Sequence, residues 1–335
     1  MQLTDVFEAM RYLSPFVHQT PVIESQTFDM LTGAHLHFKM ENLQRTGSFK
    51  LRGALNKILH LTKEQAERGI VAASAGNHAQ GVALSASKRH IKAKIFMPVA
   101  TPKAKVQATE AYGAEVVLAG DSYQESYEAA VQSRELSGAT FVHAFDDVDV
   151  MAGQGTVAVE LLQQCPDVEV VFVPIGGGGL AAGVATYLKN VNPNIRVIGV
   201  QSEFAPSMYN RFYDQGPFRL QNVHGIAEGI LVKEAGMKTF PIIRQYVDEI
   251  ITVSDKDIAR AIILMLERSK FFVEGAGAAA FAAALSGRVA IEGKKVGIIV
   301  SGGNADLENL PVFKKIAGAA RAAETSETGR GGAFN

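Results

Sequence analysis

The sequence is short of cysteine, of unbalanced charge and of long apolar runs, and each shortage excludes a class of protein. Its single cysteine, Cys165, cannot form an internal disulfide, which is typical of a reducing cytosol. A net charge of −1 gives no general attraction to nucleic acid or to a membrane surface. No apolar stretch reaches the about 18 residues of a membrane span, and the start MQLTDVFEAMRYL carries charges where a signal peptide is apolar. We therefore expect a cytoplasmic protein without nucleic-acid or membrane partners.

What the 335 residues do contain is two series of short apolar segments that alternate with helical patterns. Continuous apolar strands that alternate with helices predict mostly parallel sheets with helices on both faces, an α/β fold. Two such series predict two domains with the active site between them. The expected strands are 69–74, 93–98, 114–119 and 140–144 in the first series, and 168–175, 195–202, 249–254 and 295–301 in the second.

A run of four glycines follows one of these strands, in PIGGGGLAAG, residues 174–183. Glycines let the backbone approach a ligand and turn several N–H groups toward one point, and the N-terminus of the next helix favours an anion. A phosphate group is the expected ligand. Two alternatives stay open from the residues alone: a tight turn without a ligand, and a dinucleotide site in which Glu203 binds a ribose.

Three other expected strand ends carry polar residues. ASAGNHAQG (73–81) offers backbone N–H groups, the amide of Asn77 and a helix N-terminus, which suit a carboxylate. SGGNADL (301–307) places a hydroxyl before two glycines, and VEGAGAAAFAAA (273–284) begins a helix with Glu274, which either faces the site or only charges its helix. The carboxyl ends of strands form the ligand crevice in open α/β folds, so we expect these segments to meet.

A lysine lies directly behind a turn and ahead of an expected helix in TGSFKLRGALN, residues 46–56. A solvated surface lysine needs no such fixed surroundings. A nicotinamide enzyme would not need a lysine here either, whereas a pyridoxal phosphate (PLP) enzyme would. Lys50 is therefore a candidate for chemistry that uses an amine able to lose its proton near neutral pH.

Six segments in their order along the chain resemble the fold-type II PLP enzymes, in the threonine/serine dehydratase (threonine ammonia-lyase) branch that is related to serine racemase. They are ENLQRTGSFKLRGA, SAGNHAQGVA, MAGQGTVAVE, PIGGGGLAAG, EGAGA and SGGN. The resemblance implies a tryptophan synthase β-like fold of two domains, in a homodimer or homotetramer of the short, catabolic type. The implied division is a large PLP-binding domain of 1–51 and 146–321, a small domain of 52–145, and a flexible tail of 322–335.

The resemblance also implies a role for each site residue. Lys50 is expected to be the catalytic residue and to bind PLP covalently, while Phe49 flanks the cofactor ring. Asn77 is expected to bind the ring hydroxyl and Ser301 the pyridine nitrogen. The backbone N–H groups expected at the phosphate are those of Gly176, Gly177, Gly178, Gly179 and Leu180. The turn expected to bind the substrate carboxylate comprises Ser74, Ala75, Gly76, Asn77 and His78.

The implied activity is β-elimination of L-threonine, and of L-serine, to 2-oxobutanoate or pyruvate with release of ammonia. A serine at 301 favours elimination, because a hydroxyl only donates a hydrogen bond to a neutral nitrogen and limits delocalisation of the carbanion. Serine racemase or a dehydratase of another β-hydroxy amino acid, such as 3-hydroxyaspartate, is the alternative within the fold. A non-catalytic amino-acid or nucleotide binder is the alternative outside it.

The sequence departs from the family pattern at a few positions. Glu228 replaces the usual aspartate of the loop HGIAEGILV (224–232). Serine racemases carry a divalent cation on an acidic residue at a strand end and another six positions on; here Glu203 matches the first, but Tyr209 stands at the second. The histidines of HLHF, His35 and His37, could share a strand face and bind metal, although a plain strand edge is favoured. We expect no metal site.

Overall fold

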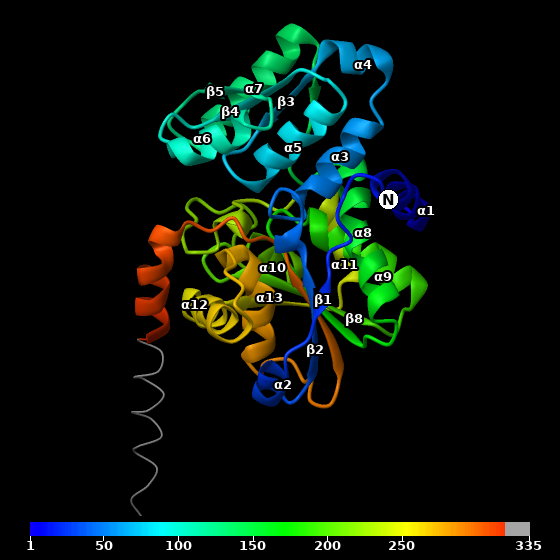
Figure 1. Ribbon diagram of the computed structural model, residues 1–335, viewed down its shortest axis with the longest axis vertical. Helices are drawn as coiled ribbons and strands as arrows, with labels where there is room; N and C mark the ends of the chain where they lie inside the picture. Colours follow the sequence, from blue (N-terminus) through cyan, green and yellow to red (C-terminus); the bar gives the residue numbers. More distant parts are fainter. Residues whose placement is uncertain (319–335) are drawn as a thin grey trace, which may run out of the picture.

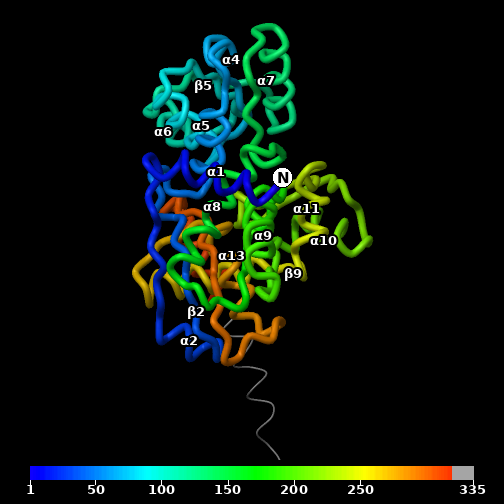
Figure 2. The backbone as a smooth tube through the Cα atoms, turned by 90° about the vertical axis from the view of Figure 1, so that its right-hand side faces the viewer, coloured from blue at the N-terminus to red at the C-terminus, as the bar shows by residue number. Residues whose placement is uncertain are grey.

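The computed structural model describes residues 1–318 and has two sheets, which lie one above the other along the long axis of the molecule (Figure 1). The six-stranded sheet has the order β1-β2-β10-β7-β8-β9, and the four-stranded sheet has the order β5-β4-β3-β6. Figure 2, turned by 90°, shows the same separation, with α4 to α7 at one end and α2 and β2 at the other. The expected flexible tail, 322–335, lies outside the described residues.

Strands and helices alternate along most of the chain. The strands are β1 (Val22–Ile23), β2 (His35–Met40), β3 (Ile70–Ala73), β4 (Ala93–Met97), β5 (Glu115–Leu118), β6 (Thr140–Phe141), β7 (Val170–Pro174), β8 (Arg196–Ser202), β9 (Glu249–Val253) and β10 (Lys295–Val300). The helices are α1 (Leu3–Leu13), α2 (Gln26–Thr32), α3 (Lys50–Leu59), α4 (Lys63–Arg68), α5 (Asn77–Lys88), α6 (Lys103–Glu110), α7 (Tyr123–Ser137), α8 (Val148–Gln164), α9 (Gly179–Val191), α10 (Ser207–Phe212), α11 (Thr239–Tyr246), α12 (Asp255–Leu264) and α13 (Gly275–Leu285). Short turns of other helix types are η1 (Glu41–Leu43), η2 (Glu228–Ile230), η3 (Met265–Ser269) and η4 (Leu307–Asn309).

The predicted α/β class with parallel sheets is confirmed. Each of the eight expected strands is present, and apart from the antiparallel β1–β2 pair the neighbouring strands in both sheets are parallel. The segment HLHF, for which the sequence favoured a plain strand edge, lies in β2. The sequence gives no indication of β1, which has only two residues. Within residues 1–318, no helix is both long and apolar enough to cross a bilayer.

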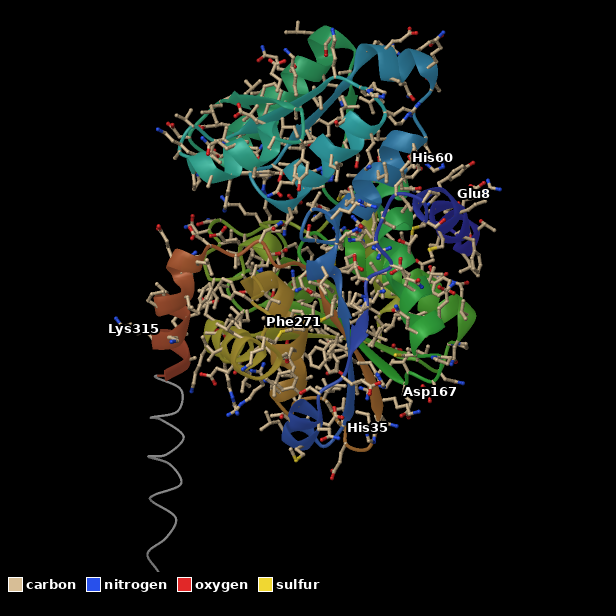
Figure 3. The ribbon with its side chains drawn as sticks, in the orientation of Figure 1. Glu8, His35, His60, Asp167, Phe271 and Lys315 are labelled. Carbon is tan, nitrogen blue, oxygen red and sulfur yellow. The ribbon has the colours of Figure 1, made fainter. Side chains whose placement is uncertain are left out.

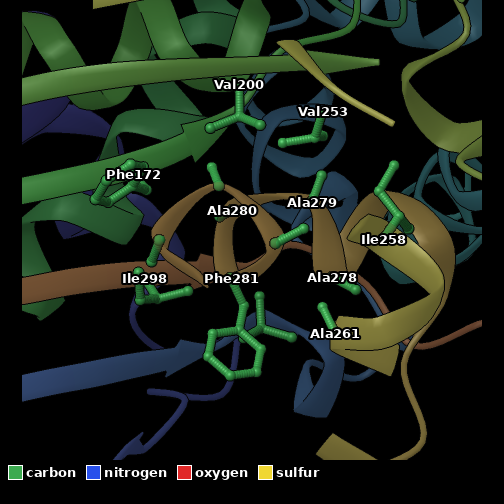
Figure 4. Close-up of a cluster of buried hydrophobic side chains, with 14 of the residues drawn as sticks. Phe172, Val200, Val253, Ile258, Ala261, Ala278, Ala279, Ala280, Phe281 and Ile298 are labelled. Carbon is green, nitrogen blue, oxygen red and sulfur yellow. The ribbon is translucent and has the colours of Figure 1, made fainter. Parts of the chain in front are cut away.

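Both faces of the large sheet are covered by helices, as its apolar strands require. Along β7, Val170 and Phe172 pack in the cluster that contains α12 and α13, whereas Val171 and Val173 pack in the cluster that contains α8 and α9. Figure 4 shows the first cluster, with Phe281 of α13 among the strand side chains. Each fully buried side chain of this kind stabilises the fold by roughly 1.5–3 kcal/mol, so sheet and helices hold each other in place.

Helix α3, which begins at Lys50, packs on both parts of the molecule. Its Leu51 and Leu55 lie in one apolar cluster with residues of α1 and α8. Ala54 and Ile58, on another face, lie in the cluster of α5 and the small sheet. The helix is therefore shared by the two parts. The exact division into domains, 52–145 against the rest, stays a prediction.

A network of four buried charges lies under the start of α3. The side chains of Lys39, Glu41, Arg52 and Glu160 are at most 1% exposed. The guanidinium of Arg52 donates to both oxygens of Glu41, at 2.8 Å each, and to both oxygens of Glu160, at 2.6 and 2.8 Å. Nζ of Lys39 donates to Glu160 at 2.7 Å. Two positive and two negative groups thus compensate one another where water cannot.

The protonation tendencies of this network follow from its geometry. Burial alone would raise the pKa of Glu41, but the charge and hydrogen bonds of Arg52 outweigh it and hold that pKa below its usual value. Burial lowers the pKa of Lys39, against the raising effect of Glu160. Burial would also lower the pKa of Arg52, yet its two carboxylate partners raise it. The network ties β2, η1, α3 and α8 into one unit.

Replacement of Glu160 tests this unit. Glu160→Gln keeps the side-chain shape but leaves Lys39 and Arg52 undercompensated, so we expect the free energy of unfolding to fall by about 3 kcal/mol. Urea denaturation followed by circular dichroism measures it. The matched control is Glu249→Gln, at a surface pair 3.3 Å from Arg196, which should unfold at nearly the wild-type urea concentration. A Glu160→Gln protein as stable as the control would contradict the importance of the network.

Candidate active site

The predicted site residues follow the carboxyl ends of strands from both sheets. Ser74 follows β3, Gly176 follows β7 and Ser301 follows β10. The turn that carries Lys50 is fixed directly onto the end of β10: the N–H of Phe49 donates to the carbonyl of Ser301 at 3.1 Å, and Ser48 forms an isolated antiparallel bridge with Gly302. The lysine, the serine and the glycine beside it are therefore neighbours.

The amine of Lys50 is half-buried between the two sheets. Its Nζ donates a hydrogen bond of 2.9 Å to the carbonyl of Ala144, which lies in the segment that follows β6. It also lies 5.3 Å from the ring centroid of Phe49. Burial lowers the pKa of Lys50 to about 8, although the charge of Glu274 acts in the opposite direction. An appreciable share of the amine is thus neutral near physiological pH, which nucleophilic or basic chemistry requires.

The glycine run forms a tight cradle beside this amine. A β-carbon at Gly177 would overlap the ring of Phe145, the residue after the Lys50 partner Ala144. Gly178 has φ +104°, a conformation that side chains rarely adopt, and α9 begins at the next residue. Oγ1 of Thr239 donates to the carbonyl of Gly177 at 2.6 Å and fixes the loop from behind. The segment 144–145 therefore brings the cradle and the lysine together.

These residues fit PLP. The first N–H groups of α9 have no acceptor within their own helix, so they and the glycine backbone can bind a phosphate dianion at the positive end of the helix dipole. Leu180, whose side chain is buried in the core, can contribute its backbone N–H there. The amine of Lys50, with its lowered pKa, fits the cofactor's aldehyde.

Asn77 and Ser301 lie close together at the same junction. Nδ2 of Asn77 donates to Oε1 of Glu274 at 2.7 Å, across the two sheets. The hydroxyl of Ser301 donates to the carbonyl of Ala276 at 3.2 Å, so it must turn before it can donate to a ligand. Glu274 stands at the N-cap of α13 without a side-chain bond to that helix. Of the two possibilities left open for Glu274, the structure thus favours the one in which it faces the site.

The turn predicted for the substrate carboxylate opens at the N-terminus of α5. Gly76 is the N-cap of this helix, and its N–H donates to Oγ of Ser74 at 3.3 Å. A β-carbon placed on Gly76 would meet no other atom within 4 Å, so there is space beside it. Ala75 packs toward the core of the small sheet. The side chain of His78 is buried, and its Nε2 forms a hydrogen bond of 2.9 Å with the carbonyl of Val142. Burial, with the nearby charge of Lys50, lowers the pKa of His78 to about 3. Its imidazole is therefore neutral and turned away, which leaves only its backbone N–H for a carboxylate.

The two histidines considered for a metal lie on β2. Figure 3 labels His35, which lies near α2 at the end of the molecule remote from the small sheet. His37 lies 3.0 Å from a carboxylate oxygen of Glu24. Among residues 1–318, no three histidine, cysteine, aspartate or glutamate side chains are grouped so that they could hold a metal ion.

Several residues at the site had given no signal in the sequence. Ala144 and Phe145 lie in FVHAFDD, which has no glycine or recognisable motif, and Thr239 lies in an ordinary helix start. Lys105 of α6 pairs with Glu228 of η2 at 2.9 Å and so joins the two sheets near Glu274. Only the unusual Glu228 could have pointed to this pair.

Comparisons with known proteins show the family of this chain. The model of the family "Pyridoxal-phosphate dependent enzyme" matches residues 13–302. The L-threonine ammonia-lyase of Thermotoga maritima is 48% identical over 308 residues, which are 92% of this chain and 77% of that protein. The crystal structure of a threonine deaminase from T.th. has a TM-score of 0.87 at 39% identity, and that of serine racemase from Dictyostelium discoideum has 0.86 at 36%; each match covers 92% of this chain and 99% of the other. With its half-buried lysine, its glycine cradle and a family match over most of its length, the chain belongs to the pyridoxal-phosphate dependent enzymes.

Proposed function

We propose that this protein is an L-threonine ammonia-lyase, which converts L-threonine to 2-oxobutanoate and ammonia, and that it also converts L-serine to pyruvate. The observation that carries the proposal is the Lys50 amine, half-buried and joined to the glycine cradle through the segment 144–145, with a pKa lowered to about 8. The names of the similar proteins support the choice of threonine. PLP, when bound, supplies an electron sink for the carbanion at the substrate's α-carbon.

Lys50 moves the proton in this scheme. Its neutral amine accepts the proton from the substrate's α-carbon, and the Ala144 carbonyl, which accepts a hydrogen bond from Nζ, helps to set the direction of the nitrogen lone pair. The β-hydroxyl then takes up a proton and leaves as water, and hydrolysis of the resulting enamine gives 2-oxobutanoate and ammonia. Phe49 flanks the cofactor ring, because its own ring lies beside Nζ. Ser301 offers only a neutral hydroxyl to the pyridine nitrogen, which favours elimination over transamination.

The remaining residues bind and orient. The backbone N–H groups of residues 176–180 hold the phosphate at the start of α9, with Thr239 fixing the loop. The substrate carboxylate binds at the start of α5, to the hydroxyl of Ser74, to backbone N–H groups of residues 75–78 and to Asn77. The imidazole of His78 has no part in this, because it is committed to Val142.

The larger organisation is part of the proposal. We propose a PLP-binding domain of 1–51 and 146–321 and a small domain of 52–145, in a cytoplasmic homodimer or homotetramer. The division is supported by the sheets, since β3 to β6 form one and the other six strands form the second. Size-exclusion chromatography with light scattering would measure the assembly.

The role of Lys50 is tested by its removal. Lys50→Ala keeps the glycine cradle, so we expect it to bind PLP weakly without a covalent bond, and to release no 2-oxobutanoate from L-threonine. Borohydride reduction followed by mass spectrometry measures the covalent bond, and a 2-oxo acid assay measures turnover. Lys57→Ala, in the same helix, is the control and should keep both. Turnover by Lys50→Ala above a few per cent of the wild-type rate would show that another group is the base.

A second prediction separates lyase from racemase. A racemase needs proton donors on both faces of the carbanion, and Ala75 has no proton where serine racemases carry a second serine. We expect L-serine to yield pyruvate with negligible D-serine, and Ala75→Ser to gain some racemase or D-serine dehydratase activity. Chiral chromatography of the L-serine reaction measures both. D-serine accumulation by the wild type at a rate comparable to that of pyruvate would favour the racemase instead.

A third prediction concerns divalent cations. Position 209 is tyrosine, so a hard cation near Glu203 would lack one carboxylate of the pattern seen in serine racemases. We expect the holoenzyme to keep its activity after treatment with EDTA, with buffer-treated enzyme as the control. Loss of activity that Mg²⁺ restores would refute this.

A further inference from the structure

Glu274 is an ionisable group at the site that the scheme above leaves without a role. Its carboxylate makes no bond to the helix that it begins, α13. It accepts instead from the amide of Asn77, and a β-carbon at Gly302, directly after Ser301, would overlap its Oε1. Glu274 thus touches Asn77, which is proposed to bind the cofactor ring, and lies against the backbone of Gly302, the residue after Ser301.

The amide of Asn77 is held from both sides in one orientation. Its Nδ2 donates to Glu274 at 2.7 Å, and its Oδ1 accepts from Nδ2 of Asn304 at 2.8 Å. Asn304 is itself fixed, because the same nitrogen donates to the carbonyl of Thr46 at 2.7 Å. An ionised carboxylate can only accept hydrogen bonds, so it requires the NH₂ end of Asn77, while the NH₂ of Asn304 requires the oxygen end.

This orientation decides what Asn77 offers to a ligand. One N–H of its amide is taken by Glu274, and the second is left to donate to an oxyanion. Rotation of the amide by half a turn would present the carbonyl oxygen instead and would repel a negatively charged ring oxygen. It would also set two NH₂ groups, those of Asn77 and Asn304, against each other.

We propose that Glu274 is a positioning residue: its ionised carboxylate, with Asn304, holds the Asn77 amide so that an N–H points to the ring oxygen of the cofactor. This rests on the proposed function, because it takes PLP to bind beside Asn77. The carboxylate acts through Asn77.

The charges around Glu274 make this positioning depend on pH. Burial raises the pKa of Glu274 to about 7; the hydrogen bond from Asn77 lowers it, Glu228 of η2 raises it, and Lys105 of α6 and Lys50 of α3 lower it. Above this pKa the carboxylate only accepts, and Asn77 keeps its orientation. Below it the protonated carboxyl can also donate a hydrogen bond, so it can pair with either end of the Asn77 amide and no longer fixes its orientation. The effect is therefore present at high pH and lost as the pH falls through about 7.

The test uses the holoenzyme and the cofactor's own signals. Glu274→Gln keeps the shape but removes the charge. We expect the absorption band of bound PLP to show a transition near pH 7 in the wild type and none in the variant, and PLP to bind the variant about tenfold more weakly in a fluorescence titration. Glu228→Gln is the matched comparison: it removes a charge that raises the pKa, so it should move the transition to lower pH without abolishing it.

The outcomes separate the two proposals. A Glu274→Gln holoenzyme with the wild-type transition and the wild-type PLP affinity would overturn the positioning role and leave the lyase standing. If Glu274→Gln does not fold, Asn304→Ala takes its place, since it removes the opposite restraint from an exposed position; it should also weaken PLP binding about tenfold, and unchanged affinity would overturn the proposal. A wild type that binds no PLP and releases no ammonia from threonine would instead overturn the proposed function, and the positioning role with it.

Discussion

The structure depends on the compensation of four charges that water cannot reach. Arg52 follows Lys50 by two residues in the same helix, and its guanidinium bonds to both Glu41 and Glu160. Separation of any one of these charges from its partners would leave a bare ion in the interior, which is far costlier than any rotation of a surface side chain. The first turn of α3 is therefore held at a fixed angle to β2 and α8. The direction in which the side chain of Lys50 leaves the helix is set by these charges two residues away.

From this anchor the site is assembled by short contacts from distant segments. The Lys50 amine meets the segment after β6, that segment meets the glycine cradle after β7, and the lysine's own turn pairs with the end of β10. Each contact joins loops at the carboxyl ends of parallel strands, where several backbone N–H groups and helix N-termini converge. The low polarity of the same junction lowers the pKa of an amine and raises that of a carboxylate. Both pKa values are thereby moved toward neutral pH.

The sequence predicted what is encoded locally. Apolar runs gave the eight expected strands, and the glycine run predicted a close backbone turn after β7, because periodicity and backbone freedom are properties of short segments. β1 gave no signal, because its two apolar residues stand between Pro21 and Glu24 and belong to no longer apolar run. The partnership of Lys39 with Glu160 spans 121 residues, and that of Asn77 with Glu274 spans 197; no local pattern shows which charges will meet. For the same reason the hydrogen bond of the His78 imidazole to the carbonyl of Val142, 64 residues away, gave no signal in the sequence.

The sharing of α3 between the two sheets has a mechanical consequence. Helix α3 is packed on one face against α1 and α8 and on another against α5, so a rotation of one sheet relative to the other would have its axis near this helix. Atoms near a rotation axis are displaced little, and atoms far from it are displaced most. Lys50, at the end of that helix, would stay nearly still during such a rotation, while the edge of the small sheet at β5 would swing furthest. The amine of Lys50 would thus keep its position if the two sheets turned relative to each other.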